Sequence, residues 1–99
     1  MPRPAPLRPD ELDAFLTSAP DWTLESGELV RSATAGSFPE AIAWVVAVAD
    51  AAERVDHHPD IDIRWRTLAF RLRTHDVGAI TSLDTLLAGE IDRIVSGSP

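Results

Sequence analysis

The chain has 99 residues, no cysteine and a formal net charge of −7, and these values exclude several classes of protein. Its length fits one domain with a modest core, and the lack of cysteine excludes disulfides, thiolate metal sites and cysteine nucleophiles. All nine basic residues are arginine, and the acidic excess disfavours nucleic-acid binding because phosphate backbones repel the chain. We interpret the local cluster of Arg64, Arg66, Arg71 and Arg73 as solvated strand edges, although it could also meet an anionic group or a partner carboxylate.

Residues 1–8 are predicted to form an extended, flexible tail, and residues 9–99 a single domain. Prolines at positions 2, 4, 6 and 9 interrupt regular pairing in the tail, which also lacks the apolar stretch of a secretory signal. The longest apolar run, Ala41 to Ala49, is too short to span a membrane. We therefore expect a cytoplasmic protein that contacts no membrane.

A helix and a hairpin are expected first. The helix begins at Pro9, which suits a first helical turn, and stops at Pro20. A short strand opening at Trp22 and a returning strand over Leu29 to Ala35 flank the turn signal Ser26-Gly27. The apolar stripe of this first helix is Leu12, Phe15 and Leu16.

The strongest helical signal follows Ser37-Phe38-Pro39-Glu40, a capping-box pattern with proline early in the helix. Apolar residues then recur at the helical period. Pro59 disfavours helical geometry at His58, so the helix is expected to end at about Asp56 or His57. Its predicted buried stripe is Phe38, Ala41, Ile42, Val45, Val46, Ala49 and Ala52, and Trp22 and Trp44 are also expected in the core.

Two further strands are predicted from an alternating pattern that changes phase. The apolar residues are Ile61, Ile63 and Trp65 at odd positions, then Leu68, Phe70 and Leu72 at even positions. One regular strand cannot change phase, because its side chains alternate with a period of two. A tight turn or a bulge near Arg66-Thr67 is therefore expected.

The pattern Thr81-x-x-Asp84 resembles a second capping box and predicts the start of the last helix. The predicted buried stripe of this helix is Leu83, Leu86, Leu87, Ile91, Ile94 and Val95. The element order α-β-β-α-β-β-α indicates an α+β fold, in which helices pack on one face of a small antiparallel sheet.

The three histidines, His57, His58 and His75, all lie at predicted element ends, where catalytic groups are commonly displayed. The turn between the two later strands lets the chain return toward the end of the long helix, so the three imidazoles could converge. The helix dipole there favours a protonated imidazole, and Glu53, four residues before His57, would share its helix face. Histidines titrate near neutral pH and can divide acid and base roles.

Other interpretations of these residues remain open. A histidine at a helix end can be a simple cap, Asp84 a capping residue, and Trp65 a core or sheet-face aromatic. Three histidines with Glu53 or Asp56 could also bind a metal. Acid–base chemistry is favoured over a metal, because adjacent side chains diverge and no histidine pair has i, i+4 spacing. No serine-elbow, phosphate-loop or dinucleotide motif is present.

A set of these residues, in order and at fixed spacings, resembles the motif of the pterin-4a-carbinolamine dehydratase family. The matching residues are Glu53, His57, His58, Pro59, Trp65, His75 and Asp84. Segments such as Thr74-His75-Asp76 and 80–84 are also similar to the family, and the resemblance covers about residues 9 to 95. Ala79 stands where a second glycine is common and Trp44 where phenylalanine is frequent, but neither touches the acid–base groups.

The resemblance implies a four-stranded antiparallel sheet backed by helices, and assembly as a homodimer or homotetramer. It implies dehydration of a 4a-hydroxytetrahydropterin to a quinonoid dihydropterin, without a metal or other cofactor. His57 and His75 would form the acid–base pair, and His58 would hold the substrate. Among the implied supporting residues, Glu53 or Asp56 would tune a histidine. Asp84 would orient His75 or cap its helix, and Trp65 would flank the ring or shape the pocket. The other implied supporting residues are Pro59, Thr74 and Asp76.

Two alternatives to this reaction stay open. A vertebrate member of the family also serves as a dimerisation cofactor for a transcription factor, so the chain could bind a protein partner without catalysis. The intact histidine set favours an enzyme, because a scaffold would not need it. The same residues could also dehydrate a different pterin or an unrelated small ring.

Overall fold

The computed structural model describes residues 4–97, and these form three helices and four strands in the order expected from the sequence. The helices are α1 (Pro9–Ser18), α2 (Phe38–Val55) and α3 (Ser82–Val95). The strands are β1 (Thr23–Glu25), β2 (Glu28–Thr34), β3 (Asp60–Arg64) and β4 (Thr67–Leu72). Residues 1–3 of the expected tail and residues 98–99 of the expected domain lie outside the described part. Within the tail, the Leu7 amide donates a hydrogen bond to the Ile80 carbonyl at 2.9 Å.

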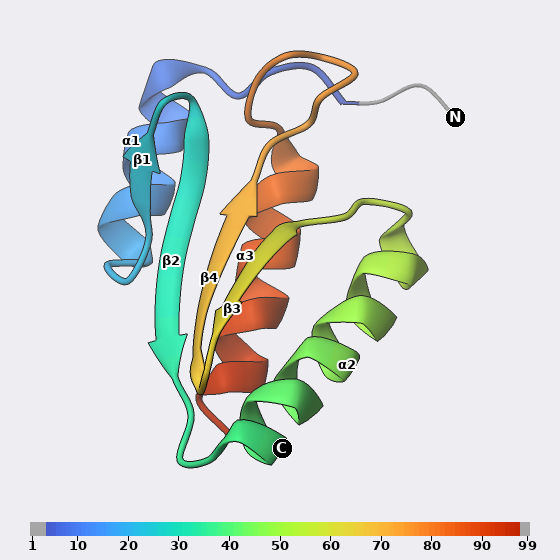
Figure 1. Ribbon diagram of the computed structural model, residues 1–99. Coiled ribbons are helices and arrows are strands. Elements are labelled where there is room, and N and C mark those ends of the chain that lie inside the picture. Colours follow the sequence, from blue (N-terminus) through green and yellow to red (C-terminus); the bar gives the residue numbers. More distant parts are fainter. Residues whose placement is uncertain (1–3, 98–99) are drawn as a thin grey trace.

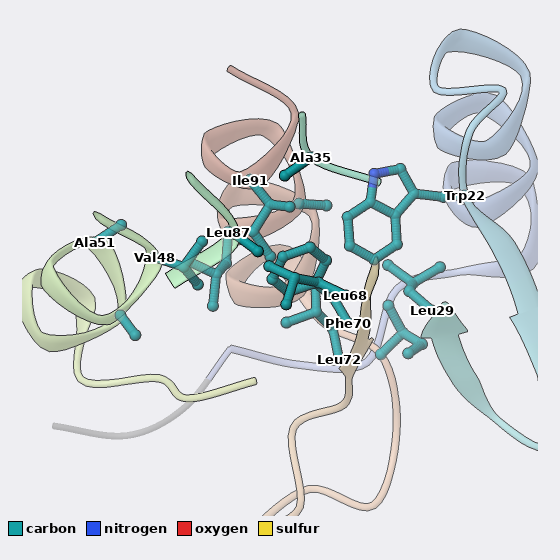
Figure 2. Packing of buried hydrophobic residues seen from close by; sticks show 14 residues of the cluster. Trp22, Leu29, Ala35, Val48, Ala51, Leu68, Phe70, Leu72, Leu87 and Ile91 are labelled. Atoms are coloured by element: carbon teal, nitrogen blue, oxygen red, sulfur yellow. The ribbon is translucent and has the colours of Figure 1, made fainter. Parts of the chain in front are cut away.

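The strands form one antiparallel sheet in the order β1-β2-β4-β3, which confirms the predicted α+β fold. One face of this sheet is apolar because Leu68, Phe70 and Leu72 alternate along β4 and Leu29 of β2 lies opposite Leu72. These four side chains are fully buried against helical residues such as Leu87. Figure 2 shows this packing, with Trp22 at one side of the core as expected.

Both hairpin turns use a positive φ angle. In the β1–β2 turn, Ser26 and Gly27 have φ of 52° and 77°, a combination that matches the twist of paired strands. In the β3–β4 turn, Trp65 has φ of 54°. This turn at Trp65-Arg66 explains the phase change in the sequence and lies one residue before the expected position.

The side chain of Trp65 is 71% exposed, so the interpretation of Trp65 as a core or sheet-face aromatic is wrong. The Arg66 guanidinium stacks on the Trp65 ring, with its central carbon 4.8 Å from the ring centroid. The turn also projects from the end of the hairpin, as Figure 1 shows at the foot of β3 and β4.

The buried face of α2 differs from the predicted stripe. Ala41 and Ala52 are buried as expected, but Phe38, Ile42 and Val46 are exposed. The other buried positions of α2 are Val48 and Ala51. Apolar residues therefore occupy two faces of α2, and only the one rich in alanine packs on the core because small side chains allow close approach.

The last helix buries Leu87, Ala88 and Ile91, while the predicted core residue Leu86 is 51% exposed. Leu86 and Leu87 point about 100° apart on a helix, so both cannot face the sheet. Asp84, in the first turn, is completely buried. It accepts the Thr81 amide at 2.9 Å, which confirms the predicted capping box.

The α2–β3 connection and the loop between β4 and α3 lie at the same end of the sheet (Figure 1). The β3–β4 turn with Trp65 lies at the opposite end. No helix within residues 4–97 is both long and apolar enough to cross a bilayer.

Candidate active site

The three histidines meet at one pocket of about 170 Å³. His57 and His58 come from the α2–β3 connection, and His75 comes from the loop after β4. The predicted convergence of the imidazoles is therefore confirmed as geometry. The remaining lining residues are Arg73, Thr74 and Asp76.

A left-handed residue at the end of α2 directs His57 inward. Asp56 has φ of 50° and ψ of 47°, and the His57 amide donates to the Ala52 carbonyl at 3.1 Å. This is the usual way to close a helix, with the chain reversing after the last turn. After this reversal His57 is buried, and only 5% of it is exposed.

The carboxylate of Asp84 anchors the ring of His57. His57 Nε2 lies 2.5 Å from Asp84 Oδ1, and both groups are buried. The other oxygen, Oδ2, accepts the Thr74 hydroxyl at 2.8 Å and the Thr81 amide at 2.9 Å. Asp84 therefore binds His57 and caps α3. Of its two expected roles, capping is confirmed, and it orients His57 instead of His75.

The hydroxyl groups around Asp84 have a defined direction of donation. Thr74 donates to the carboxylate, so the 2.7 Å contact between the two hydroxyls is donated by Thr81 to Thr74. The Leu83 amide then donates to the Thr81 oxygen at 3.2 Å. The carboxylate thus has only donors around it, and its ionised form is well satisfied.

This network also fixes the tautomer of His57. The carboxylate of Asp84 accepts hydrogen bonds at Oδ2 and has only acceptor oxygens to offer, so Nε2 of His57 is the donor to Oδ1. The second nitrogen, Nδ1, has no hydrogen-bond partner within residues 4–97 and is not sealed from solvent. A neutral His57 therefore presents a lone pair on Nδ1, next to the pocket.

His58 differs from His57 because its ring is solvated. Its Nε2 lies 2.5 Å from Glu53 Oε2, and the two side chains are 58% and 75% exposed. The expectation that Glu53 would contact His57 is wrong, since the reversal at Asp56 turns His57 away from the helix face that carries Glu53. An exposed pair of this kind holds a side chain only weakly.

His75 is exposed and forms no side-chain hydrogen bond within the described part of the chain. It lies in a compact loop that the Thr74 amide closes by donating to the Ala79 carbonyl at 3.0 Å. The Gly78 amide donates to the carbonyls of Thr74 and His75, at 2.9 and 3.1 Å. The backbone of this loop is therefore held while the His75 ring faces solvent.

The remaining predicted site residues lie at different distances from the pocket. Asp76 and Thr74 line it. Pro59 directly follows the lining residue His58 and is half-buried, and Asp56 is the exposed cap at the end of α2. Trp65 lies at the far end of the β3–β4 hairpin, so within one chain it does not line the pocket. Across residues 4–97, no three His, Asp or Glu side chains are grouped as ligands of one metal ion.

The sequence is similar to one protein family over nearly its whole length. A family model described as pterin 4 alpha carbinolamine dehydratase matches residues 5–94. The chain belongs to this family. A Nocardia farcinica relative, provisionally named pterin-4-alpha-carbinolamine dehydratase, is 50% identical over 88 residues, which are 89% of this chain and 93% of the relative. A relative from Mycolicibacterium smegmatis with the same provisional name is 49% identical, covering 93% and 98% of the two chains.

Two solved structures share the fold. A Brucella melitensis protein described as a transcriptional coactivator/pterin dehydratase has a TM-score of 0.87 and 25% identity, covering 91% of this chain and 98% of that one. A pterin dehydratase-like RuBisCO assembly factor of the alpha-carboxysome has a TM-score of 0.62 and 17% identity, covering 75% and 86%. The latter likeness concerns the fold alone.

Two residues of this dehydratase-family site were not proposed from the sequence. Thr81 supports Thr74 and caps α3, and its capping pattern could have indicated a buried hydroxyl. Arg73 lines the pocket, and the interpretation of Arg73 as a solvated strand edge is wrong because its Nε is buried. Arg64 and Arg71 are exposed on strands, as that interpretation requires.

Proposed function

We propose that this protein is a pterin-4a-carbinolamine dehydratase, which removes water from a 4a-hydroxytetrahydropterin to give a quinonoid dihydropterin. The observation that carries the proposal is the single pocket formed by His57, His58 and His75, with His57 held by a buried carboxylate. Membership of the family and the provisional names of the relatives support the same reaction.

His57 is proposed as the general base. Asp84 keeps the proton on Nε2, which leaves the Nδ1 lone pair to accept the proton from N5 of the substrate. The N5–H electron pair then forms the double bond between N5 and C4a. Once His57 is an imidazolium, the nearby carboxylate stabilises its charge.

His75 is proposed as the general acid. As the bond between C4a and oxygen breaks, the hydroxyl takes a proton from the imidazolium of His75 and leaves as water. His57 gains one proton and His75 loses one, so exchange with solvent restores both. The exposure of His75 makes that exchange direct. His58, which pairs with Glu53, is proposed to hold the substrate.

The proposal is tested by following formation of the quinonoid product from a 4a-hydroxytetrahydropterin generated in the assay. The purified protein should accelerate dehydration well above the rate in buffer, and the acceleration should vanish in a double His57→Ala/His75→Ala variant. Equal rates with and without the protein would overturn the proposal. Activity on other hydroxylated pterins only would indicate a different pterin substrate.

A second role, protein binding, is favoured by the exposed apolar face of α2. Phe38, Ile42 and Val46 recur every four residues and lie together on one side of the helix, with Val46 58% exposed. Exposed apolar faces of this kind mark interfaces. We propose that a second copy of this chain covers the face, which gives the homodimer or homotetramer that the family resemblance implies. The cytoplasmic location of the protein stays a prediction.

The mass in solution tests this assembly. Light scattering after gel filtration should give the mass of a dimer or tetramer. Val46→Asp should shift this mass toward that of the monomer. The variant does not change the neighbouring core residue Val48, which is buried within the chain. A wild-type monomer at micromolar concentration would contradict self-association. An active monomer would indicate that a different protein binds this face. The description of the Brucella melitensis protein as a transcriptional coactivator suggests such a partner for that protein.

A further inference from the structure

Arg73, directly after β4, separates two hollows at the same end of the molecule. On one side it lines the pocket of the three histidines. On the other it lines a hollow of about 260 Å³, whose apolar wall includes Leu7, Leu12, Leu24 and Ile80. Because both hollows share Arg73, they adjoin at this side chain. A molecule bound among the histidines could therefore extend past Arg73 into the second hollow.

The guanidinium of Arg73 lies beside two glycines, and one of them binds it. Nη2 donates to the Gly78 carbonyl at 2.9 Å. A Cβ atom built on Gly27 would lie 3.8 Å from Nη1, and one built on Gly78 would lie 3.7 Å from Nη2. Both glycines also line the second hollow. The charged end of Arg73 thus lies at the margin of that hollow, between the β1–β2 turn and the loop after β4.

The charge of Arg73 has no counterion among the residues that the structure describes. Within residues 4–97 its guanidinium forms no ion pair, and its Nε is buried without a hydrogen-bond partner. The neighbouring cation Arg71, in contrast, lies 3.9 Å from a carboxylate oxygen of Glu28. A partly buried guanidinium with unused donors is unfavourable alone and becomes favourable when an anion accepts from it. The chain carries a net charge of −7, so carboxylates that could have paired with Arg73 are plentiful in it.

We propose that Arg73 makes the site selective for ligands whose ring bears an anionic substituent, a carboxylate or a phosphate. The ring lies among the histidines, and the substituent reaches the guanidinium at the edge of the second hollow. The planar guanidinium suits such groups because it can offer two parallel donors. This inference rests on the proposed function, since it deepens the description of the same site.

The test compares two fluorescent ring analogues, pterin-6-carboxylate and the neutral 6-methylpterin, by titration of wild-type protein. Wild type should bind the carboxylate about tenfold or more tightly than the neutral analogue, as expected for a charge-assisted pair. Arg73→Gln should abolish this preference. Arg71→Gln, a matched control on the exposed side of β4, should retain it.

Each outcome separates the inference from the function on which it rests. Equal affinities of wild type for the two analogues, or a preference that survives Arg73→Gln, would overturn the selectivity while leaving the dehydratase proposal intact. Binding of neither analogue would overturn both. If Arg73→Gln fails to fold by circular dichroism, the wild-type preference in rising salt decides. The charged end of Arg73 lies at the margin of the hollow, so the preference should fall as salt screens it, and a preference that salt leaves unchanged would overturn the inference.

Discussion

Replacing Asp84 by asparagine tests the origin of the reactivity of His57. The side chain keeps its shape but has one acceptor and one donor in place of two acceptors. Thr74 and the Thr81 amide both donate to Oδ2, so the amide oxygen of Asp84→Asn must occupy that position. The amide NH₂ then faces His57 and requires a lone pair on Nε2. The proton of His57 consequently moves to Nδ1, and the base facing the pocket is lost.

The expected magnitude follows from these contacts. A general base contributes about 10²–10⁴-fold to a rate, and loss of the correct tautomer in an Asp–His pair has cost about 10⁴-fold elsewhere. We therefore expect kcat to fall by about 10²–10⁴-fold. Asp84→Asn retains three hydrogen bonds but makes them neutral, and each bond loses about 1 kcal/mol. A loss of about 3 kcal/mol leaves a domain of this size folded.

Two measurements check this prediction. Steady-state dehydration gives kcat, and nitrogen–proton correlation spectra of the imidazole show which nitrogen of His57 carries the proton. Asp92→Asn is the matched control, because Asp92 also lies on α3 and accepts from Trp22 and Arg31, far along the helix from the histidines. It should lower stability without lowering kcat. Wild-type kcat in Asp84→Asn, with the proton moved to Nδ1, would refute the role of Nδ1.

Other substitutions separate catalysis from stability. His57→Ala or His75→Ala should each lower kcat by about 100-fold or more while the variants stay folded, and unchanged rates in both would exclude them as acid and base. Leu87→Ala should cost about 2–5 kcal/mol in urea unfolding because the side chain is fully buried. Leu86→Ala, half exposed, should cost less than about 1 kcal/mol, and equal losses would contradict the observed burial. Glu53→Gln should change the free energy of unfolding by less than about 1 kcal/mol, because its partner is exposed, and should raise KM rather than lower kcat.

Element order and the meeting of the histidines could be predicted from the sequence, because turns, caps and alternation are local signals. The Ser26-Gly27 turn and the Thr81-x-x-Asp84 cap each depend on residues that are close in the chain. The phase change before Leu68 required a tight turn or a bulge whatever the rest of the chain does, and the structure has the turn.

The partners within the site could not be predicted, because they depend on long-range packing. Glu53 at i−4 is a reasonable partner for His57 only if the helix continues, and the left-handed geometry of Asp56 ends it first. Asp84 is 27 residues from His57, and no spacing rule relates them. The faces of α2 were likewise ambiguous, since alanine and larger apolar residues give two stripes of the same period.

Asp84 both caps the first turn of α3 and holds the imidazole of His57. Fraying of the first turn of α3 would release the Thr81 amide and let the carboxylate drift, and the imidazole would lose its alignment in the same event. Local opening and inactivation of this enzyme candidate should therefore share one rate. Mutations that loosen that turn should therefore abolish the reactivity of His57 under conditions in which the rest of the molecule stays folded.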